Sequence, residues 1–212
     1  KNFGTGVLMM DPYTGEVRDS TKEDLGNVER FIDSMDTVDV FSIAVAAGDV
    51  NQKVKSLHEA EVVFNNLTKN FAHDLEGIKN TQRFIDMDAA ISGGYDKLRE
   101  RPIITMGACP NSPLEINENE TDIIILSARH GLPIDILSMG LCGGTTPATL
   151  AGTLVTTNAE ILGGIVLSQL INKGNPILYG SSTTIMDMKA ATSPVGAPEH
   201  AMFGAAVGQI GH

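Results

Sequence analysis

Positive charge is scarce in this chain of 212 residues. Lysine and arginine together number 15 against 26 aspartates and glutamates, which gives a formal net charge of −11 at pH 7. A surface that binds nucleic acid needs clustered basic side chains, so this composition argues against a nucleic-acid partner. Charged residues make up 19% of the chain and hydrophobic residues 42%, values that are ordinary for a globular protein and exclude general disorder.

Cysteine and long apolar runs are scarce as well. The two cysteines, Cys109 and Cys142, each follow a predicted strand and do not form a disulfide framework, which suits reduced thiols in a cytosolic protein. No secretory signal is present, and no run reaches the ~18 uninterrupted apolar residues of a membrane span. The longest apolar helix, residues 148–170, is interrupted by polar residues such as Thr157 and Glu160. We therefore expect a cytoplasmic protein with no membrane contact, in which this helix is buried.

Five short apolar segments predict strands at a nearly constant spacing. They are residues 38–45, 70–75, 102–108, 133–140 and 176–181. Their starting positions are 32, 32, 31 and 43 residues apart. A (β/α)₈ barrel of ~250 residues uses about 31 residues per unit, so the first three spacings match this fold. The continuous apolar character of the segments is typical of buried parallel strands.

The gaps between these strands carry helix signals. Ser56 with Glu59 predicts a capping box, Gly93 and Gly131 predict the ends of helices over 78–91 and 119–130, and Pro198 predicts the start of the last helix. Before the first strand, a turn signal at 11–15 predicts a hairpin, and residues 21–35 predict an amphipathic helix with Leu25, Val28, Phe31, Ile32 and Met35 inward.

The predicted fold class is therefore α/β, a (β/α)₈ TIM barrel. About five βα units over residues 38–212 and an N-terminal lead-in over residues 1–35 form a single partial domain. We expect the chain to be an internal piece of a longer protein, because residues 201–212 read as a helix that feeds another strand.

Residues 134–170 predict a buried strand, a glycine-threonine loop and a long helix in which Pro147 occupies the first turn. In barrel folds such strand-end loops carry the chemistry. The loop Gly143–Thr146 has two interpretations: an anion site at a helix N-terminus, or a plain turn and helix cap.

Chemically useful side chains collect at the predicted carboxyl ends of the strands. They are Ser42, His73, Asp74, Met106, Cys109, Ser138, Met139, Cys142, Tyr179, Ser181, Ser182 and Thr183. This set has no lysine for a Schiff base and no pair of facing glutamates, so we identify no catalytic residue. No local ligand spacing supports zinc at His73, Cys109 and Cys142, so we predict no bound metal.

Several of these residues have alternative roles. His73 and Asp74 are either a pair that orients a substrate or a strand end whose histidine is satisfied by backbone. Tyr179 offers an aromatic face to a cation or is a core ring. The four hydroxyls from Ser181 to Thr184 are expected to face the barrel mouth, and the loop over 186–198 is expected to be a lid or docking surface.

Three segments then identify a family resemblance. The chain resembles the trimethylamine:corrinoid methyltransferase family in the segments ILSMGLCGGTTPATLAGTLVTTNAEILGGIVLSQL, PILYGSSTTIMDMKAATSPVGAPE and ITMGACPNSPLEI. The similarity extends over essentially all 212 residues, including KNFGTGV. The resemblance implies a (β/α)₈ barrel that moves a methyl group from a methylated amine to the Co(I) of a separate corrinoid protein, in methylamine metabolism such as methanogenesis. It implies no metal bound by the chain itself, and we expect a homo-oligomer.

Under this resemblance we assign two groups of residues. The expected substrate-binding residues are His73, Asp74, Met106, Met139, Tyr179, Ser181 and Ser182. The expected corrinoid-docking residues are Gly143, Gly144, Thr145, Thr183 and Thr184. A quaternary ammonium needs no general acid, because its nitrogen is already charged, so the task of the protein is desolvation and alignment.

The substrate stays open between two subdivisions of the family. Trimethylamine enzymes carry pyrrolysine in a segment expected beyond His212, whereas non-pyrrolysine relatives act on quaternary amines such as glycine betaine. The run FAHDL favours a quaternary amine, because trimethylamine enzymes are expected to be richer in histidine there. Two other functions stay possible: a phosphate-binding barrel lyase or isomerase, and a betaine-binding barrel without turnover.

Overall fold

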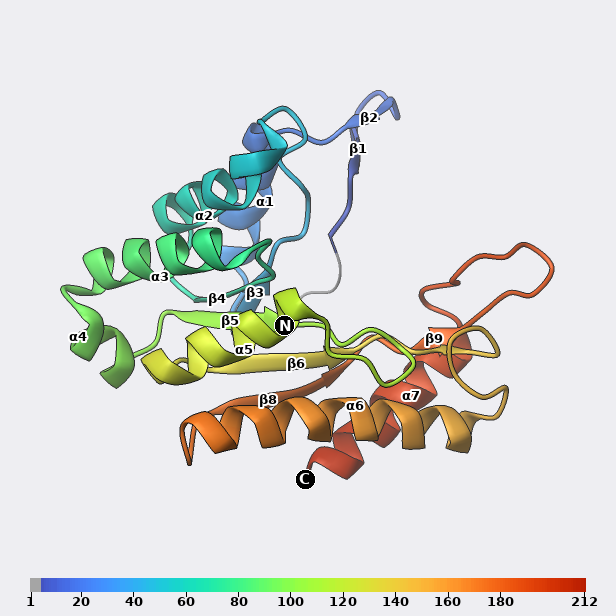
Figure 1. The fold of residues 1–212 in the computed structure, drawn as a ribbon. Coiled ribbons are helices and arrows are strands. Elements are labelled where there is room, and N and C mark those ends of the chain that lie inside the picture. Colours follow the sequence, from blue (N-terminus) through green and yellow to red (C-terminus); the bar gives the residue numbers. More distant parts are fainter. Residues whose placement is uncertain (1–4) are drawn as a thin grey trace. The chain divides into compact units, whose positions relative to one another are not determined.

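The computed structural model describes residues 5–212, which form two compact units, a first that ends at Thr105 and a second over Met106–His212. The first unit contains β1 (Leu8–Met10), β2 (Val17–Asp19), α1 (Lys22–Asp33), β3 (Val40–Ser42), the 3₁₀ turn η1 (Gln52–Val54), α2 (Lys55–Asn66), β4 (Asn70–His73), α3 (Ile78–Ser92), α4 (Tyr95–Glu100) and the start of β5 (Ile104–Ala108). The second unit contains the rest of β5, α5 (Glu118–His130), β6 (Ile134–Ser138), β7 (Leu141–Cys142), α6 (Leu150–Ile171), β8 (Ile177–Ser181), β9 (Thr184–Ile185) and α7 (Pro198–Gly211). Figure 1 labels these elements.

The five predicted strands are all present, and they are parallel. They are hydrogen-bonded in the order β3-β4-β5-β6-β8. In the first unit Val40 of β3 lies opposite Asn70 of β4. In the second unit β6 lies between β5 and β8, with Ile136 opposite Tyr179. The predicted α/β class with parallel strands in chain order is confirmed, whereas a closed eight-stranded barrel and a single domain stay predictions.

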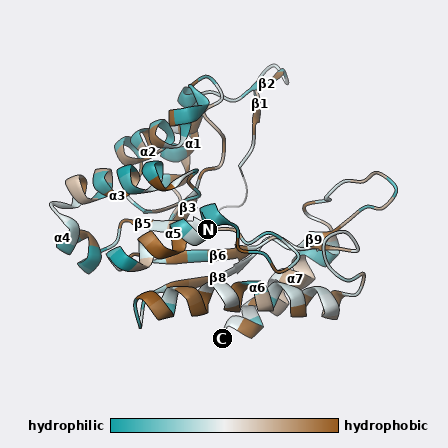
Figure 2. Cartoon of the chain, in the orientation of Figure 1, coloured by the Kyte–Doolittle hydropathy of each residue, from teal (hydrophilic) through white to brown (hydrophobic). Residues whose placement is uncertain are grey.

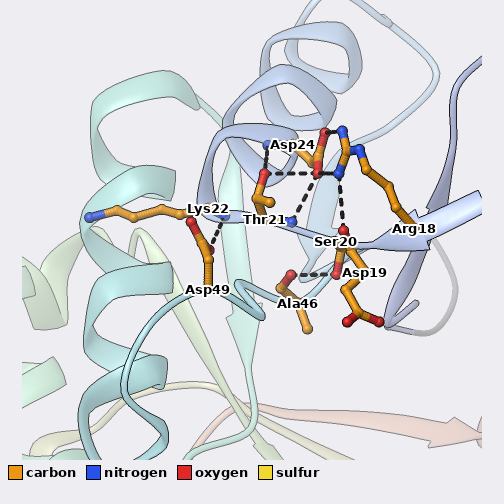
Figure 3. Close-up of polar contacts among 8 residues, drawn as sticks. All are labelled: Arg18, Asp19, Ser20, Thr21, Lys22, Asp24, Ala46 and Asp49. Carbon is orange, nitrogen blue, oxygen red and sulfur yellow. Dashed lines mark hydrogen bonds and ion pairs between the residues drawn. The ribbon is translucent and has the colours of Figure 1, made fainter.

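The predicted lead-in hairpin and helix are confirmed for the described residues, since β1 and β2 pair antiparallel. Figure 3 shows how polar contacts hold the start of α1. The Arg18 guanidinium donates to both carboxylate oxygens of Asp24, at 2.6 and 2.8 Å, and holds the pKa of that carboxyl below its usual range. Asp24 also forms a capping box with Thr21. The backbone amide of Lys22 donates to Asp49, which ties the helix to the segment that follows β3.

Two helix ends confirm the sequence prediction and one corrects it. Gly93 and Gly131 end α3 and α5 in the left-handed conformation. The capping box at Ser56 is wrong: α2 begins at Lys55 directly after η1, which Asn51 caps, and Glu59 instead accepts a hydrogen bond from the backbone of Ala47 at 2.9 Å. The chain also has a short helix that was not predicted, α4.

The buried face of α1 differs from the predicted one. Leu25 and Ile32 are buried, but Phe31 is 62% exposed and Glu29 is fully buried. Leu25, Glu29 and Ile32 are three or four residues apart, as one helix face requires, and Phe31 falls outside that face.

Two carboxylates are buried in the first unit without a hydrogen-bond partner. Both oxygens of Glu29 and both of Asp88 lack a hydrogen-bond partner among the described residues. Burial raises the pKa of Glu29 to about 8, with nearby Arg30 opposing the rise and Glu59 adding to it. Burial alone raises the pKa of Asp88 to about 9. Both groups therefore keep their protons at neutral pH.

The helix α6 buries an unusual face in the second unit. Its buried residues are Thr153, Thr157, Glu160, Ile161, Gly164 and Ser168, which are mostly polar or small. Its exposed positions include Val155, Leu162, Val166 and Leu170, so apolar residues occur all along the helix, as Figure 2 shows. By length and composition alone, α6 is the one helix within residues 5–212 that is apolar enough to cross a membrane. The prediction of a buried helix is correct for one face only.

The start of α6 differs from the prediction. The helix begins at Leu150, and Thr149 caps it by accepting from the backbone of Gly152. Pro147 therefore lies before the cap and not in the first turn. In α7, which begins at Pro198 as predicted, Phe203 and Val207 are the buried residues.

Close approach of α6 to the sheet depends on Gly164. A Cβ at Gly164 would lie 2.9 Å from Cδ1 of Ile136 on β6, which is closer than side chains tolerate. The neighbouring Gly163 has more room, since its Cβ would meet only Cδ1 of Ile116 at 3.5 Å.

We expect Gly164→Ala to destabilise the chain by about 1–3 kcal/mol, because the added methyl group forces Ile136 or the helix to move. Gly163→Ala should be neutral or stabilising by up to about 1 kcal/mol, because alanine restricts the unfolded chain and fits the site. Denaturant unfolding of both variants measures the difference. Equal free energies of unfolding for the two variants would contradict the close packing of α6 on β6.

We also expect the free energy of unfolding to fall as pH rises from about 5 to 8. The unfolded chain releases the protons of Glu29 and Asp88 near pH 4, whereas the folded chain keeps them until about pH 8–9. In this interval the folded state binds more protons, so each group lowers stability by at most roughly 1.4 kcal/mol per pH unit.

Asp88→Asn should flatten this pH dependence, because the amide does not ionise. Asp36→Asn, at an exposed position, is the matched control and should leave the slope unchanged. The measurement is denaturant unfolding at a series of pH values. A slope in Asp88→Asn that matches the wild type would show that Asp88 ionises normally in the folded chain.

Candidate functional site

The strand ends of the second unit place the candidate site residues on two faces of the sheet. Side chains alternate between faces along a strand, and residues in register share a face. Ile136 contacts α6 at Gly164, and Ser138 contacts α6 at Glu160. The even-numbered residues of β6 therefore point to the helices, and the odd-numbered residues point to the opposite face.

Three predicted substrate-binding residues point to the helix side. Met106 pairs with Ile134 and is completely buried. Tyr179 pairs with Ile136, and its hydroxyl donates to Asn158 of α6 at 2.6 Å. Ser181 pairs with Ser138. The structure thus places the half-buried Tyr179 against α6 with a satisfied hydroxyl, whose pKa burial raises, and cation binding by its ring stays a prediction.

Glu160 is the polar centre of the helix side, and sequence reasoning did not find it. Its side chain is 3% exposed. One oxygen accepts from the Ser138 hydroxyl at 2.5 Å and from the Ser112 hydroxyl at 2.9 Å, and the other accepts from the backbone of Leu114 at 2.9 Å. A single carboxylate thus ties α6 to the end of β6 and to the loop that follows β5. The only available signal was one acidic residue in an otherwise uncharged helix.

Two of the four residues in the hydroxyl run 181–184 are buried, which corrects the expectation that all four hydroxyls face the mouth. Thr183 and Thr184 are each 1% exposed. Thr183 accepts from Ser181 at 2.7 Å and lies 3.3 Å from the hydroxyl of Thr157 on α6. Thr184 donates to the backbone of Pro194 at 3.1 Å. These hydroxyls hold the segment in place, because they are satisfied within the second unit.

The backbone amides of the glycine-threonine loop are occupied. The amides of Gly144, Thr145 and Thr146 all donate to the carbonyl of Leu141, and the amide of Gly143 donates to Thr146. A phosphate cradle needs free amides that point at the ligand. The loop therefore has the plain-turn conformation, and the anion-binding interpretation of Gly143–Thr146 loses its physical basis.

The outer part of this loop is exposed and adjoins the segment after β9. Gly144 and Thr145 are exposed. A Cβ at Gly144 would lie 2.7 Å from Sδ of Met186, so the two loops are in close contact. Figure 1 shows the long loop over 186–197 extending away from β9. Docking at Gly143, Gly144 and Thr145 stays a prediction.

Exposed apolar side chains mark the loops at the strand ends. Leu114 after β5, Met139 after β6, and Met188 and Val195 after β9 are exposed by 66%, 50%, 72% and 60%. Exposed large apolar side chains at the ends of neighbouring strands are typical of a contact surface.

Ser182 is half-buried, and its amide donates to the Ser138 carbonyl.

His73 and Asp74 belong to the first unit. His73 is 7% exposed, its Nε2 lies 3.3 Å from the carbonyl of Ser56 and 3.6 Å from Glu59, and its ring stacks on Phe71. Burial lowers its pKa to about 4, so the imidazole is neutral at pH 7. The structure therefore gives a strand-end histidine in contact with backbone. Asp74 is exposed, and substrate binding by the pair stays a prediction.

Neither Cys109 nor Cys142 is in a disulfide, and Cys142 is buried in β7 whereas Cys109 is half-buried. The Cys109 amide donates to Glu120 of α5 at 2.7 Å. Within residues 5–212, no three histidine, cysteine, aspartate or glutamate side chains lie close enough together to hold a metal ion.

A second residue that sequence reasoning missed is Asp135. It is the second residue of β6, on the face opposite α6, and is 4% exposed. Its neighbours Ile134, Ile136 and Leu137 are apolar, so a buried carboxylate at this position is an exception to the core pattern.

We expect Glu160→Ala to destabilise the chain by about 1–3 kcal/mol, because it leaves the buried Ser138 hydroxyl and the more accessible donors of Ser112 and Leu114 without their acceptor. Glu160→Gln should cost less, because its amide oxygen still accepts one of these hydrogen bonds. The measurement is denaturant unfolding, with the exposed Glu115→Ala expected within about 0.5 kcal/mol of wild type. Equal stability of Glu160→Ala and Glu115→Ala would contradict the role of the carboxylate.

Comparisons with known proteins identify the family. The family model described as "Trimethylamine methyltransferase (MTTB)" matches residues 6–212. The chain is 51% identical to the trimethylamine methyltransferase MttB of Desulfitobacterium hafniense (strain DSM 10664 / DCB-2), over 99% of the chain and 42% of that protein. It is 41% identical to the MttB of Methanosarcina barkeri (strain Fusaro / DSM 804), over 98% of the chain and 43% of that protein.

A more distant relative has a different named substrate. The glycine betaine methyltransferase of Desulfitobacterium hafniense (strain Y51) is 30% identical, over 98% of the chain and 43% of that protein. The chain thus spans less than half the length of these relatives. Because the family model covers nearly all of it, the chain belongs to the trimethylamine methyltransferase family.

Proposed function

We propose that the protein containing this chain transfers a methyl group from a methylated amine to a corrinoid carried by a separate protein, and that its barrel closes to eight strands. The family match over residues 6–212 carries this proposal. The parallel strands in chain order, joined by helices, support the barrel.

The relatives favour one substrate over the other. Proteins named trimethylamine methyltransferases are 40–51% identical to this chain, whereas the one named a glycine betaine methyltransferase is 30% identical. These identities support trimethylamine as the first candidate, against the preference for a quaternary amine drawn from FAHDL. Glycine betaine stays the second candidate substrate.

The proposed methyl transfer needs little general acid or base catalysis from the second unit. The partner's corrinoid supplies a Co(I) nucleophile, and a neutral amine leaves from a positively charged nitrogen. What this chain must provide is an apolar, water-poor position that aligns the N–CH₃ bond, with a negative charge near the nitrogen. The half-buried Leu137 and Leu178 on the face opposite α6 provide apolar walls for such a position.

The corrinoid protein is proposed to dock on the exposed loops after β6 and β9. Gly144 and Thr145 form the outer edge of one loop, and Met188 and Val195 lie on the other. Close contact between these loops at Gly144 and Met186 would present them as one surface. Thr183 and Thr184 are the buried part of the proposed surface. Their hydroxyls contact Thr157 of α6 and the Pro194 carbonyl and so position the β9 segment.

A cytoplasmic location and a homo-oligomeric state are part of the same proposal. Two cysteines that form no disulfide support a reducing compartment. The exposed apolar positions on α6, such as Val155 and Leu170, support association.

The test is a methyl-transfer assay with the full-length protein and its reduced corrinoid partner. We expect trimethylamine to be converted to dimethylamine together with a change in the visible spectrum of the corrinoid. Glycine betaine and tetramethylammonium are assayed in parallel to fix the substrate class. Absence of transfer from all three amines would refute the proposal, and tight binding without transfer would identify a binding protein instead.

Met188→Glu tests the docking surface. A charge on this exposed apolar side chain should weaken association with the corrinoid protein by about tenfold and leave amine binding unchanged. Met202→Glu, on the exposed side of α7, is the matched control. Equal partner affinity for the two variants would exclude docking at Met188.

A further inference from the structure

The outward face of α6 is apolar from one end of the helix to the other. Its exposed residues are Ala151, Val155, Ala159, Leu162, Gly163, Val166 and Leu170. The exposed fractions of Val155, Leu162, Val166 and Leu170 are 70%, 46%, 57% and 80%. The structure describes the whole of α6, and none of the exposed residues of this helix is polar or charged.

These residues form a continuous stripe, because successive members are three or four residues apart. We call Ala151, Val155, Ala159, Leu162, Val166 and Leu170 the α6 stripe. Gly163 lies at its edge, where a Cβ would meet Ile116 at 3.5 Å. The opposite face of the helix carries Thr153, Thr157 and Glu160, which are buried. A helix at a water-exposed surface normally has the reverse arrangement, and a continuous exposed apolar surface marks an interaction site.

The elements of the second unit leave the α6 stripe uncovered. The helix packs its polar face on β6 and contacts α5 and α7, its neighbours along the chain. In the barrel proposed above, the helices form an outer ring around the sheet, so further βα units extend this ring and do not lie over α6. The occupant of the stripe therefore comes from outside the barrel.

A membrane fits the surroundings of the stripe poorly. A spanning helix has lipid on all sides, whereas α6 holds the buried Glu160 in three hydrogen bonds to the rest of the unit. A helix that lies on a membrane surface usually has lysine and arginine beside its apolar face. Residues 150–171 contain neither.

A second copy of the same chain fits the charge of the stripe. Each chain has a formal net charge of −11, so two copies repel each other wherever acidic side chains meet. The one charged residue of α6, Glu160, is buried on the inward face. Two α6 stripes therefore meet without placing like charges in contact.

The order of side chains along the stripe is self-complementary. A two-fold axis at the centre of Leu150–Ile171 pairs two α6 helices antiparallel over their whole length. The residues of one copy that then lie opposite those of the second copy are Ala151 with Leu170, Val155 with Val166, and Ala159 with Leu162. An alanine meets a leucine in two of these pairs, and two valines meet in the third. The pairs are thus of similar combined size, as interdigitating layers require.

The size of the stripe is also adequate. A helix of 22 residues is about 33 Å long and with its side chains about 10 Å wide, so its outward half has roughly 500 Å² of surface. A standard interface buries about 800 Å² per partner. Two α6 helices thus provide more than half of such an interface, and the adjoining α5 and α7 provide the rest.

From these observations we propose that the α6 stripe is the contact between two copies of this chain, with the two α6 helices antiparallel about a two-fold axis. This inference deepens the homo-oligomeric state proposed above and rests on it. It names the surface, the partner and the pairs of residues that meet.

The test measures self-association of the full-length protein by sedimentation velocity over a range of concentrations. We expect the wild type to dimerise with a dissociation constant of about 1 μM or tighter. Val155→Glu should raise this constant by about tenfold or more, because it buries a charge against Val166 of the second copy. Ile91→Glu, at a position 57% exposed on α3 of the first unit, is the matched control and should change the constant by less than about threefold.

A second substitution tests the antiparallel pairing. Adding Val166→Lys to Val155→Glu places a lysine opposite each glutamate in both halves of the dimer, so association should recover by about fivefold or more relative to Val155→Glu alone. Leu162→Lys, which does not lie opposite residue 155, should restore less when it is added to Val155→Glu. Equal recovery with the two lysines would contradict the proposed pairing.

Four results would overturn the inference. The first is a full-length wild type that stays monomeric at about 100 μM. The second is a dissociation constant that Val155→Glu does not change. The third is binding of the wild type to phosphatidylcholine vesicles that Val155→Glu abolishes, which would assign the stripe to a membrane. The fourth is failure of both Val155→Glu and Leu170→Glu to fold, which would show that the stripe is covered within a single chain.

The two proposals fail in different ways. If the wild type associates but Val155→Glu leaves its dissociation constant unchanged, the homo-oligomeric state stands and only the assignment of α6 is wrong. If the wild type is monomeric and transfers methyl groups, the reaction stands without the dimer. If it associates through α6 and transfers no methyl group, the surface stands and the proposed reaction is wrong.

Discussion

The close contact between α6 and β6 decides the chemistry of the second unit. Gly164 lets the helix approach Ile136, and Glu160 binds the hydroxyl of Ser138 one helical turn away. These contacts fix the even-numbered residues of β6 against the helix. Because side chains alternate along a strand, the same contacts direct Asp135 and Leu137 to the other face. A shift of one residue would exchange the two faces completely.

Polar groups replace much of the apolar packing between this helix and the sheet. Glu160, Thr157 and Thr153 lie on the buried face of α6, where leucine or valine is usual, and each is hydrogen-bonded. A fully satisfied buried network specifies geometry, because any displacement leaves a donor or acceptor without a partner. Here the network connects the loop after β5, the end of β6 and the β9 segment. It therefore positions the strand-end loops without contributing a reactive group of its own.

The site chemistry and the stability of the fold use acidic residues in different ways. In the first unit, Glu29 and Asp88 are buried without hydrogen-bond partners and keep their protons. In the second unit, Glu160 is held by three donors. Asp135 is buried on the opposite face of β6. The net negative charge of the chain does not distinguish these different environments of its acidic residues.

The sequence by itself determined the repeating strands, the helix ends at Gly93 and Gly131, and the family. These follow from local apolar patterns, from the left-handed backbone that glycine adopts, and from extended strings of ordered residues. Sequence reasoning could not determine which face of each strand carries the site. Met106 and Tyr179 lie at strand positions as plausible as that of Asp135, and only the packing of α6 assigns them to the helix side. Glu160 was missed for the same reason, because its three partners are 22 to 48 residues away in the chain. Local pattern fixes which elements form, whereas long-range contacts decide which side chains those elements bring together.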